Sequence, residues 1–154
     1  MQTAAPARVA KAAAVKHAIW STLEDTRRFV PLTDDPMPTS MEHYKVPHFD
    51  AKGESDRCFV DAGVPTTILL TSFNWQNLIF FGMGPKLDGA EGLAWTMPLG
   101  TAKFPGIAVE DSGRCAYGIF KRGTELTGNY VGIAGEHMSR ASLRLNSPIL
   151  RQQA

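Results

Sequence analysis

The sequence predicts an α/β fold with a parallel sheet. Twice a helix-forming segment leads through a short turn into a brief apolar segment, at residues 4–20 and again at 48–71. The second apolar segment is β-branched and then continuously apolar, which is typical of a strand covered on both faces of a parallel sheet. Hydrophobic residues make up 44% of the 154 residues and charged residues 20%, so the chain can form an ordinary globular core.

The elements of the first half follow from local composition. Residues 4–14 are rich in alanine with Arg8 and Lys11 among them, which predicts a helix, and residues 15–20 have the apolar character of a short strand. Pro47 suits the first turn of a helix and Gly63 suits the position after its end. We therefore predict a helix over 48–62 and a strand over 64–71.

A long loop is predicted between the first strand and the second helix. Residues 31–47 contain four prolines and two adjacent aspartates, which are residues typical of loops. Loops of this length in compact domains are usually functional or mobile. We expect this loop to pass over a functional site.

The second half of the chain predicts shorter elements. The clearest is a helix over 111–121, because acidic residues precede its first turn and basic residues follow its last, as the helix dipole favours. The others are a helix over 73–81, a strand over 92–99, a strand over 129–134 and a weak helix from Ser139 to Pro148.

Composition argues against several classes of function. A net charge of +1 gives no strong field for nucleic acid or an anionic membrane. The longest uncharged stretch, 62–85, contains Pro65 and three side-chain amides that a membrane-spanning helix would bury unpaired, so we predict no membrane span. Two cysteines make no disulfide framework, which favours a cytoplasmic setting. The four histidines lack partners at metal-ligand spacing, so we predict no metal site.

Three polar groups of residues mark a candidate site. His48 and Lys52 are four residues apart on a predicted helix and so share a face. Ser21 and Thr22 follow the first strand, and the segment Asn74, Trp75, Gln76, Asn77 follows the second. Because open parallel sheets bind ligands at the carboxyl ends of their strands, we expect the three groups to meet in one crevice.

Each group also has a simpler interpretation. On spacing alone, His48 and Lys52 are more typical of solvated surface residues in a helix than of a ligand site. Serine, threonine and asparagine are common in turns and helix caps for reasons unrelated to ligands. Both interpretations stay open at this point.

Seven segments in order resemble the NmrA-like family, the atypical short-chain dehydrogenase/reductases. The resemblance covers roughly residues 8–138 and fades after Ser139. The segments are Trp20–Glu24, Val46–Glu54, Gly63–Thr67, Ser72–Leu78, Pro98–Gly100, Pro105–Gly113 and Val131–His137.

The resemblance implies a Rossmann domain that binds NAD(P), with a smaller substrate-side domain beside it. Some members of the family reduce small molecules, and others sense the nicotinamide redox state and regulate transcription. Lys52 matches the family's helix lysine that contacts the nicotinamide ribose, and Asn74, Trp75, Gln76 and Asn77 match its cofactor-side loop.

The resemblance also implies which residues would take part in catalysis. Ser21 or Thr22 matches the position where active short-chain dehydrogenases keep a hydroxyl. A tyrosine four residues before the lysine donates a proton to the substrate carbonyl in those enzymes, and His48 stands there in this sequence. Neutral imidazole relays protons near pH 7, but it does not replace the phenol. We therefore expect binding rather than turnover, with His48, Lys52, Ser21 and Thr22 as the candidate catalytic set.

The family's N-terminal glycine-rich turn does not occur in this sequence. Gly82-Met83-Gly84 precedes Pro85 and ends an element, where the dinucleotide motif should open a helix. We therefore expect an N-terminally truncated member with an incomplete Rossmann-type parallel sheet, and weakened affinity for NADP or NAD because the pyrophosphate donors are missing. The strands near residues 17 and 66 are expected to have unpaired neighbours.

The expected organisation has three parts. Residues 1–80 form the C-terminal part of a Rossmann-like domain, 81–138 a smaller substrate-side region, and 139–154 a divergent tail. The alternative function is a non-catalytic regulatory module that binds a partner protein or a second copy of the chain through an exposed sheet face.

Overall fold

A computed structural model of the chain describes residues 4–34, 37–87, 93–95, 97 and 99–139. They form two compact units. The first comprises the chain up to Thr71 together with Cys115–Ile133, and the second comprises Ser72–Arg114 and the chain from Ala134 onward. The chain changes unit between Thr71 and Ser72, within a helix between Arg114 and Cys115, and between Ile133 and Ala134.

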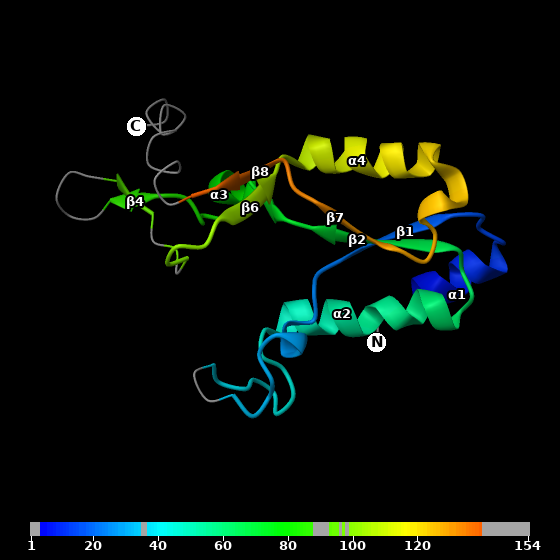
Figure 1. The fold of residues 1–154 in the computed structure, drawn as a ribbon, viewed down its shortest axis with the longest axis horizontal. Coiled ribbons are helices and arrows are strands. Elements are labelled where there is room, and N and C mark those ends of the chain that lie inside the picture. The colour runs from blue at the N-terminus through cyan, green and yellow to red at the C-terminus, as the bar shows by residue number, and fades with distance from the viewer. Residues whose placement is uncertain (1–3, 35–36, 88–92, 96, 98, 140–154) are drawn as a thin grey trace. The chain divides into compact units, whose positions relative to one another are not determined.

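The first unit is built on a parallel sheet of three strands. Its order is β1-β2-β7, and Trp20 of β1 pairs in register with Ile68 of β2, which pairs with Tyr130 of β7. Helices α1 and α2 lie on one face of this sheet (Figure 1). The elements are α1 (Ala4–Ala12), β1 (Ala18–Thr22), η1 (Thr26–Arg28), α2 (Pro47–Asp61), β2 (Thr66–Thr71), η2 (Gly123–Leu126) and β7 (Tyr130–Ile133).

The parallel α/β class is confirmed, with two corrections. The two strands expected near residues 17 and 66 were expected to lack neighbours, but they pair with each other, and β2 is the central strand with β7 on its other side. The first strand also begins later than predicted, at Ala18, because Val15 pairs with Ala10 in the turn that closes α1.

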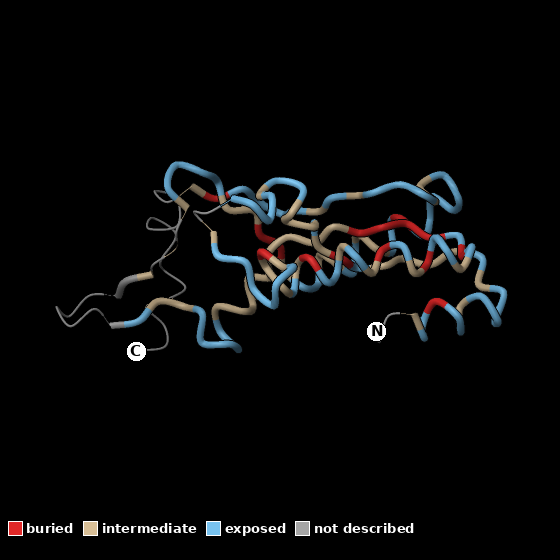
Figure 2. Tube along the Cα trace, turned by 90° about the horizontal axis from the view of Figure 1, so that it is seen from below, coloured by how far each residue is buried: buried red, intermediate tan, exposed pale blue. Residues whose placement is uncertain are grey.

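The core of the first unit lies between the two helices and the sheet. Ala7 of α1, Phe59 of α2 and Val64 form its buried centre, and the ring of Trp20 packs against Phe59 with centroids 5.1 Å apart. Among the described residues the longest buried run is Thr66–Leu69 of β2, red in Figure 2. The central strand β2 is therefore buried on both of its faces over these residues.

The second unit has a small mixed sheet of order β3-β6-β8, parallel between β3 and β6 and antiparallel between β6 and β8. Strands β4 and β5 pair with each other in an antiparallel, separate two-stranded sheet. The elements are β3 (Phe73–Asn74), α3 (Asn77–Phe80), β4 (Lys86–Leu87), β5 (Leu93–Ala94), β6 (Phe104–Ile107), α4 (Val109–Lys121), which ends in the first unit, and β8 (Glu136–Met138).

The predictions for this half need correction. The helix expected over 73–81 is reduced to Asn77–Phe80, because Phe73 and Asn74 pair with β6. The strand expected over 92–99 is limited to Leu93–Ala94 within the described residues. The helices and strand expected over 48–62, 111–121 and 129–134 are observed within two residues of those bounds, and the weak helix after Ser139 lies outside the described residues.

Candidate functional site

Lys52 lies at the carboxyl end of the first strand of the parallel sheet. It is exposed on the second turn of α2, and its ammonium donates to the main-chain oxygen of Ser21 over 3.5 Å. His48, one turn earlier on α2, is exposed, and its ring meets that of Phe49 edge-on at 4.7 Å. The amino-terminal half of α2 therefore brings a cation to the strand edge at which parallel sheets bind ligands.

The two hydroxyl residues of β1 have different surroundings. Ser21 is exposed, whereas Thr22 is 0% exposed and its hydroxyl donates to the main-chain oxygen of Leu23 at 3.4 Å. Successive side chains of a strand point to opposite faces, so only one of two neighbours reaches the solvent side. Ser21 is the hydroxyl available next to Lys52.

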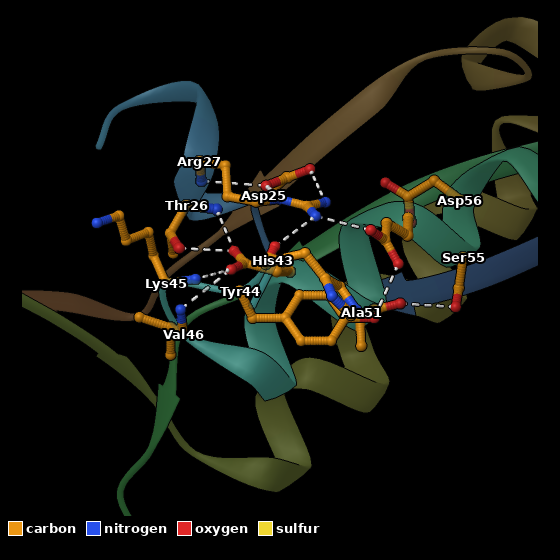
Figure 3. A network of polar contacts seen from close by, with 12 residues as sticks. Asp25, Thr26, Arg27, His43, Tyr44, Lys45, Val46, Ala51, Ser55 and Asp56 are labelled. Atoms are coloured by element: carbon orange, nitrogen blue, oxygen red, sulfur yellow. Dashed lines mark hydrogen bonds and ion pairs between the residues drawn. The ribbon is translucent and has the colours of Figure 1, made fainter. Parts of the chain in front are cut away.

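Asp50 anchors the start of α2, and the sequence reasoning missed it. Its carboxylate is 0% exposed. One oxygen, Oδ1, accepts from the main-chain N–H of Thr26 at 2.8 Å and from its hydroxyl at 2.6 Å, while Oδ2 accepts from the N–H groups of Lys45 at 2.7 Å and Val46 at 3.0 Å (Figure 3). The available signal was an aspartate in the first turn of a helix whose N-cap, Val46, has no capping side chain.

Hydrogen bonding determines the charge state of Asp50. Burial alone would raise the pKa of its carboxyl, but the donors from Thr26, Lys45 and Val46 stabilise the carboxylate and hold the pKa below its ordinary value. The group is therefore an ionised acceptor at neutral pH. It is fully occupied by protein donors and not available to a ligand.

A second set of polar contacts connects the same segments around Arg27. Its guanidinium pairs with Asp25 and Glu54, each at 2.7 Å, and donates to the main-chain oxygen of His43 at 3.1 Å (Figure 3). The hydroxyl of Tyr44 donates to Glu54 at 3.1 Å. These contacts attach the long loop before α2 to the helix. They also leave the phenol of Tyr44 hydrogen-bonded to Glu54.

The predicted amide segment lies in the second unit and has mixed roles. The ring of Trp75 packs against Phe104 at 6.0 Å and over Gly106, where any side chain would collide with it. The Gln76 amide donates to Glu110 at 2.9 Å and accepts from the N–H of Val109 at 3.1 Å, so it caps the start of α4. Both are therefore structural.

Asn74 and Asn77 differ from these neighbours. Asn74 belongs to β3 and Asn77 opens α3, and among the described residues no partner hydrogen-bonds to either side chain. Both remain able to bind a ligand. That they share a crevice with Lys52, which lies in the first unit, stays a prediction.

A pocket of about 600 Å³ lies in the first unit beside α2. Asp56 occupies its wall, accepting from the indole of Trp20 at 2.9 Å and from the hydroxyl of Tyr130 at 3.2 Å. Burial, with Asp56 nearby, raises the pKa of Tyr130. His48 and Lys52 do not line this pocket, and Lys52 instead contacts the main-chain oxygen of Ser21 at the carboxyl end of β1. The lining comprises Leu23, Glu24, Asp25, Arg28, Gly53, Asp56, Arg57, Val60, Leu70 and Tyr130.

Metal clusters and membrane spans are both missing from the described residues. No three histidine, cysteine, aspartate or glutamate side chains gather there in a way that would hold a metal ion. None of the helices in the described part of the chain is both long and apolar enough to cross a bilayer.

The fold and the sequence together define the class of protein. The chain belongs to the NmrA-like family, whose family model matches residues 2–143. The expected resemblance is confirmed, and so is the expected incomplete Rossmann-type parallel sheet.

Solved structures support the same fold. One is a crystal structure of NmrA, described as a negative transcriptional regulator, with a TM-score of 0.71, 23% identity, and coverage of 92% of this chain and 42% of that one. Another is a crystal structure of an NmrA mutant with two substitutions to glycine, with a TM-score of 0.68, 22% identity, and coverage of 89% and 41%. The chain thus spans about two fifths of the length of each of these structures.

Proposed function

We propose that this chain supplies the nicotinamide side of an NAD(P) site in an NmrA-like protein. The observation that carries the proposal is the position of Lys52, whose ammonium lies 3.5 Å from the main-chain oxygen of Ser21 at the carboxyl end of β1. Ligands of open parallel sheets bind at this edge. Membership of the family supports the choice of a nicotinamide dinucleotide as the ligand.

The residues at this edge suit that ligand chemically. The Lys52 ammonium has three donors, of which the contact to Ser21 uses one, and the others are available to ribose hydroxyls. Ser21 adds an exposed hydroxyl. The family resemblance adds Asn74 and Asn77 to the proposed set, because their amides donate and accept as the carboxamide of nicotinamide requires. When bound, the dinucleotide supplies hydride chemistry.

The proposed activity is binding and not turnover. The position four residues before Lys52 holds the imidazole of His48, and the phenol of Tyr44 is bonded to Glu54. Thr22 is buried, so of the two hydroxyls only that of Ser21 is accessible to a ligand. Neither His48 nor Tyr44 therefore offers this site a free phenol to polarise a substrate carbonyl. This favours the sensing branch of the family over the reducing one.

Titration with NADPH, followed by its fluorescence, tests the proposal. We expect saturable binding to the wild-type chain and about tenfold weaker binding to Lys52→Ala, because a hydrogen bond from a charged donor contributes roughly 1.5–3 kcal/mol. Asn74→Ala and Asn77→Ala should each weaken binding less, since an amide is a neutral partner.

Lys11→Ala is the matched control. Its ammonium also donates to a main-chain oxygen, that of Gly63 at 3.2 Å, but Gly63 precedes β2 and so lies at the amino end of the parallel strands. Lys11→Ala should bind NADPH as the wild type does. Equal loss in the two variants, or no saturation at millimolar NADPH, would overturn the proposal.

A second candidate function is self-association. Ile79, Phe80 and Phe81 are consecutive and 59%, 75% and 76% exposed, which is unusual for large apolar side chains in a row. Such a surface at α3 is typical of a protein contact. Sedimentation velocity of a Phe80 variant distinguishes this function from cofactor binding.

A further inference from the structure

The carboxylate of Asp50 joins three segments that meet at the proposed site. Its Oδ1 binds Thr26, just after the exit of β1, and its Oδ2 binds Lys45 and Val46, at the end of the long loop. The carboxylate itself belongs to the first turn of α2. Four hydrogen bonds of 2.6–3.0 Å from two loops therefore converge on one buried group.

These bonds fix the helix against the strand that Lys52 touches. Lys52 follows Asp50 by less than one turn of α2, and Ser21 lies on the strand whose exit Asp50 holds through Thr26. Gly53 permits the close approach, because a Cβ at this position would lie 2.8 Å from the Cβ of Asp25. The start of α2 is thus held beside the end of β1, where the Lys52 ammonium lies.

We propose that Asp50 is a positioning residue for Lys52. It holds α2 against the exit of β1, so that the ammonium stays at the strand edge where the proposed nicotinamide site lies. This inference rests on the proposed function for its ligand. A carboxylate is needed because it is only an acceptor, whereas an asparagine amide would turn N–H donors toward two of the four N–H and O–H groups.

The fold has other contacts that hold the same segments. Arg27 pairs with Asp25 and Glu54, and Asp56 accepts from Trp20 and Tyr130, so α2 remains attached to β1 and β7 when Asp50 is replaced. We therefore expect Asp50→Asn to fold, with a local shift at the start of α2. Thr26→Val removes only the hydroxyl bond to Oδ1 and is a milder variant of the same kind.

A double-mutant cycle with NADPH as the ligand tests the proposal. We expect Asp50→Asn to weaken binding about fivefold in the wild-type background and to have no effect in the Lys52→Ala background, since a residue that acts through another loses its effect when the other is removed. Thr26→Val should show the same pattern with a smaller factor. Asp61→Asn, an exposed aspartate at the far end of α2, is the control and should bind like the wild type.

Equal factors for Asp50→Asn in both backgrounds would mean a general structural role and would overturn the proposal. So would wild-type affinity in Asp50→Asn. A purely structural defect would also lower the affinity of Lys52→Ala further, which the proposal excludes.

A second readout needs no cofactor and separates this inference from the proposed function. In the wild type, nuclear Overhauser contacts should join the Lys52 side chain to the backbone around Ser21. We expect Asp50→Asn to lose them and Asp61→Asn to keep them. If wild-type NADPH binding fails while these contacts are lost in Asp50→Asn, the proposed function falls and the positioning role stands; if Asp50→Asn keeps the contacts, the positioning role falls.

Discussion

At the scale of single residues, two buried carboxylates connect the segments of the first unit. Asp50 and Asp56 are both buried on α2, and between them they bind two loops, the β1 strand and the β7 strand. A buried carboxylate is costly unless its oxygens are hydrogen-bonded, and in both residues each oxygen accepts at least one bond. Substitution of Asp50 therefore leaves donors unpaired in the interior, and substitution of Asp56 leaves the indole N–H of Trp20 without its acceptor.

The pKa shifts predict an acid-sensitive fold. The pKa of Asp50 is lowered by its donors against burial, and that of Asp25 is lowered mainly by its hydrogen bond to Arg27. A carboxyl with a lowered folded-state pKa contributes stability that is present above the unfolded value of about 3.9 and is lost as pH falls through the folded value. We expect the free energy of unfolding from urea titrations to drop below about pH 4.

Urea titrations of Asp50→Asn over the same pH range measure how much of this pH dependence comes from Asp50. This variant should be about 2–3 kcal/mol less stable than the wild type at pH 7, because it leaves buried donors unpaired, and the difference should shrink in acid. Asp61→Asn should keep the wild-type profile. A difference between Asp50→Asn and wild type that is constant with pH would contradict the assignment.

At the scale of elements, glycine has opposite effects on the stability of the helix α4 and the strand β6. Gly113 lies inside α4, and a Cβ built there meets nothing within 4 Å. Gly106 lies in β6 directly beneath the ring of Trp75, which leaves no space for a side chain. The first glycine weakens its element, and the second allows its element to pack.

Alanine at the two positions should therefore change stability in opposite directions. We expect Gly113→Ala to stabilise the protein by about 0.5–1 kcal/mol through helix propensity, and Gly106→Ala to destabilise it by about 1–3 kcal/mol through overpacking. Thermal unfolding followed by circular dichroism measures both. Loss of stability in Gly113→Ala would contradict the open space around that helix position, and none in Gly106→Ala would contradict the packing beneath Trp75.

At the scale of the whole molecule, the surface carries an apolar segment and little net charge. A net charge of +1 gives weak mutual repulsion between copies, and Ile79, Phe80 and Phe81 offer a contact. Both features favour association of one chain with another.

We expect the sedimentation coefficient of the wild type to rise with protein concentration, and that of Phe80→Ser to stay at the monomer value. Phe29→Ser is the matched control, because Phe29 is also a strongly exposed phenylalanine, 67% against 75%, but belongs to the first unit, whereas α3 belongs to the second. Concentration dependence that survives in Phe80→Ser would place the contact elsewhere.

The sequence by itself determined the family, the parallel α/β class and the main helices. Helices such as α2 and α4 depend on local signals, namely Pro47, Gly63 and the charges at the ends of residues 109–121, and these are readable without the fold. The candidate residues His48, Lys52 and Ser21 were also readable, because motif spacing is local.

Only the tertiary structure decided what depends on distant partners. The strand β6 contains Pro105 and Gly106, which are poor strand formers, and it exists because β3 and β8 pair with it. Thr22 is hidden and Ser21 exposed because of the face that each presents. The role of Asp50 depends on Thr26, 24 residues earlier, and the hydrogen bonds of a buried carboxylate are set by which segments fold around it.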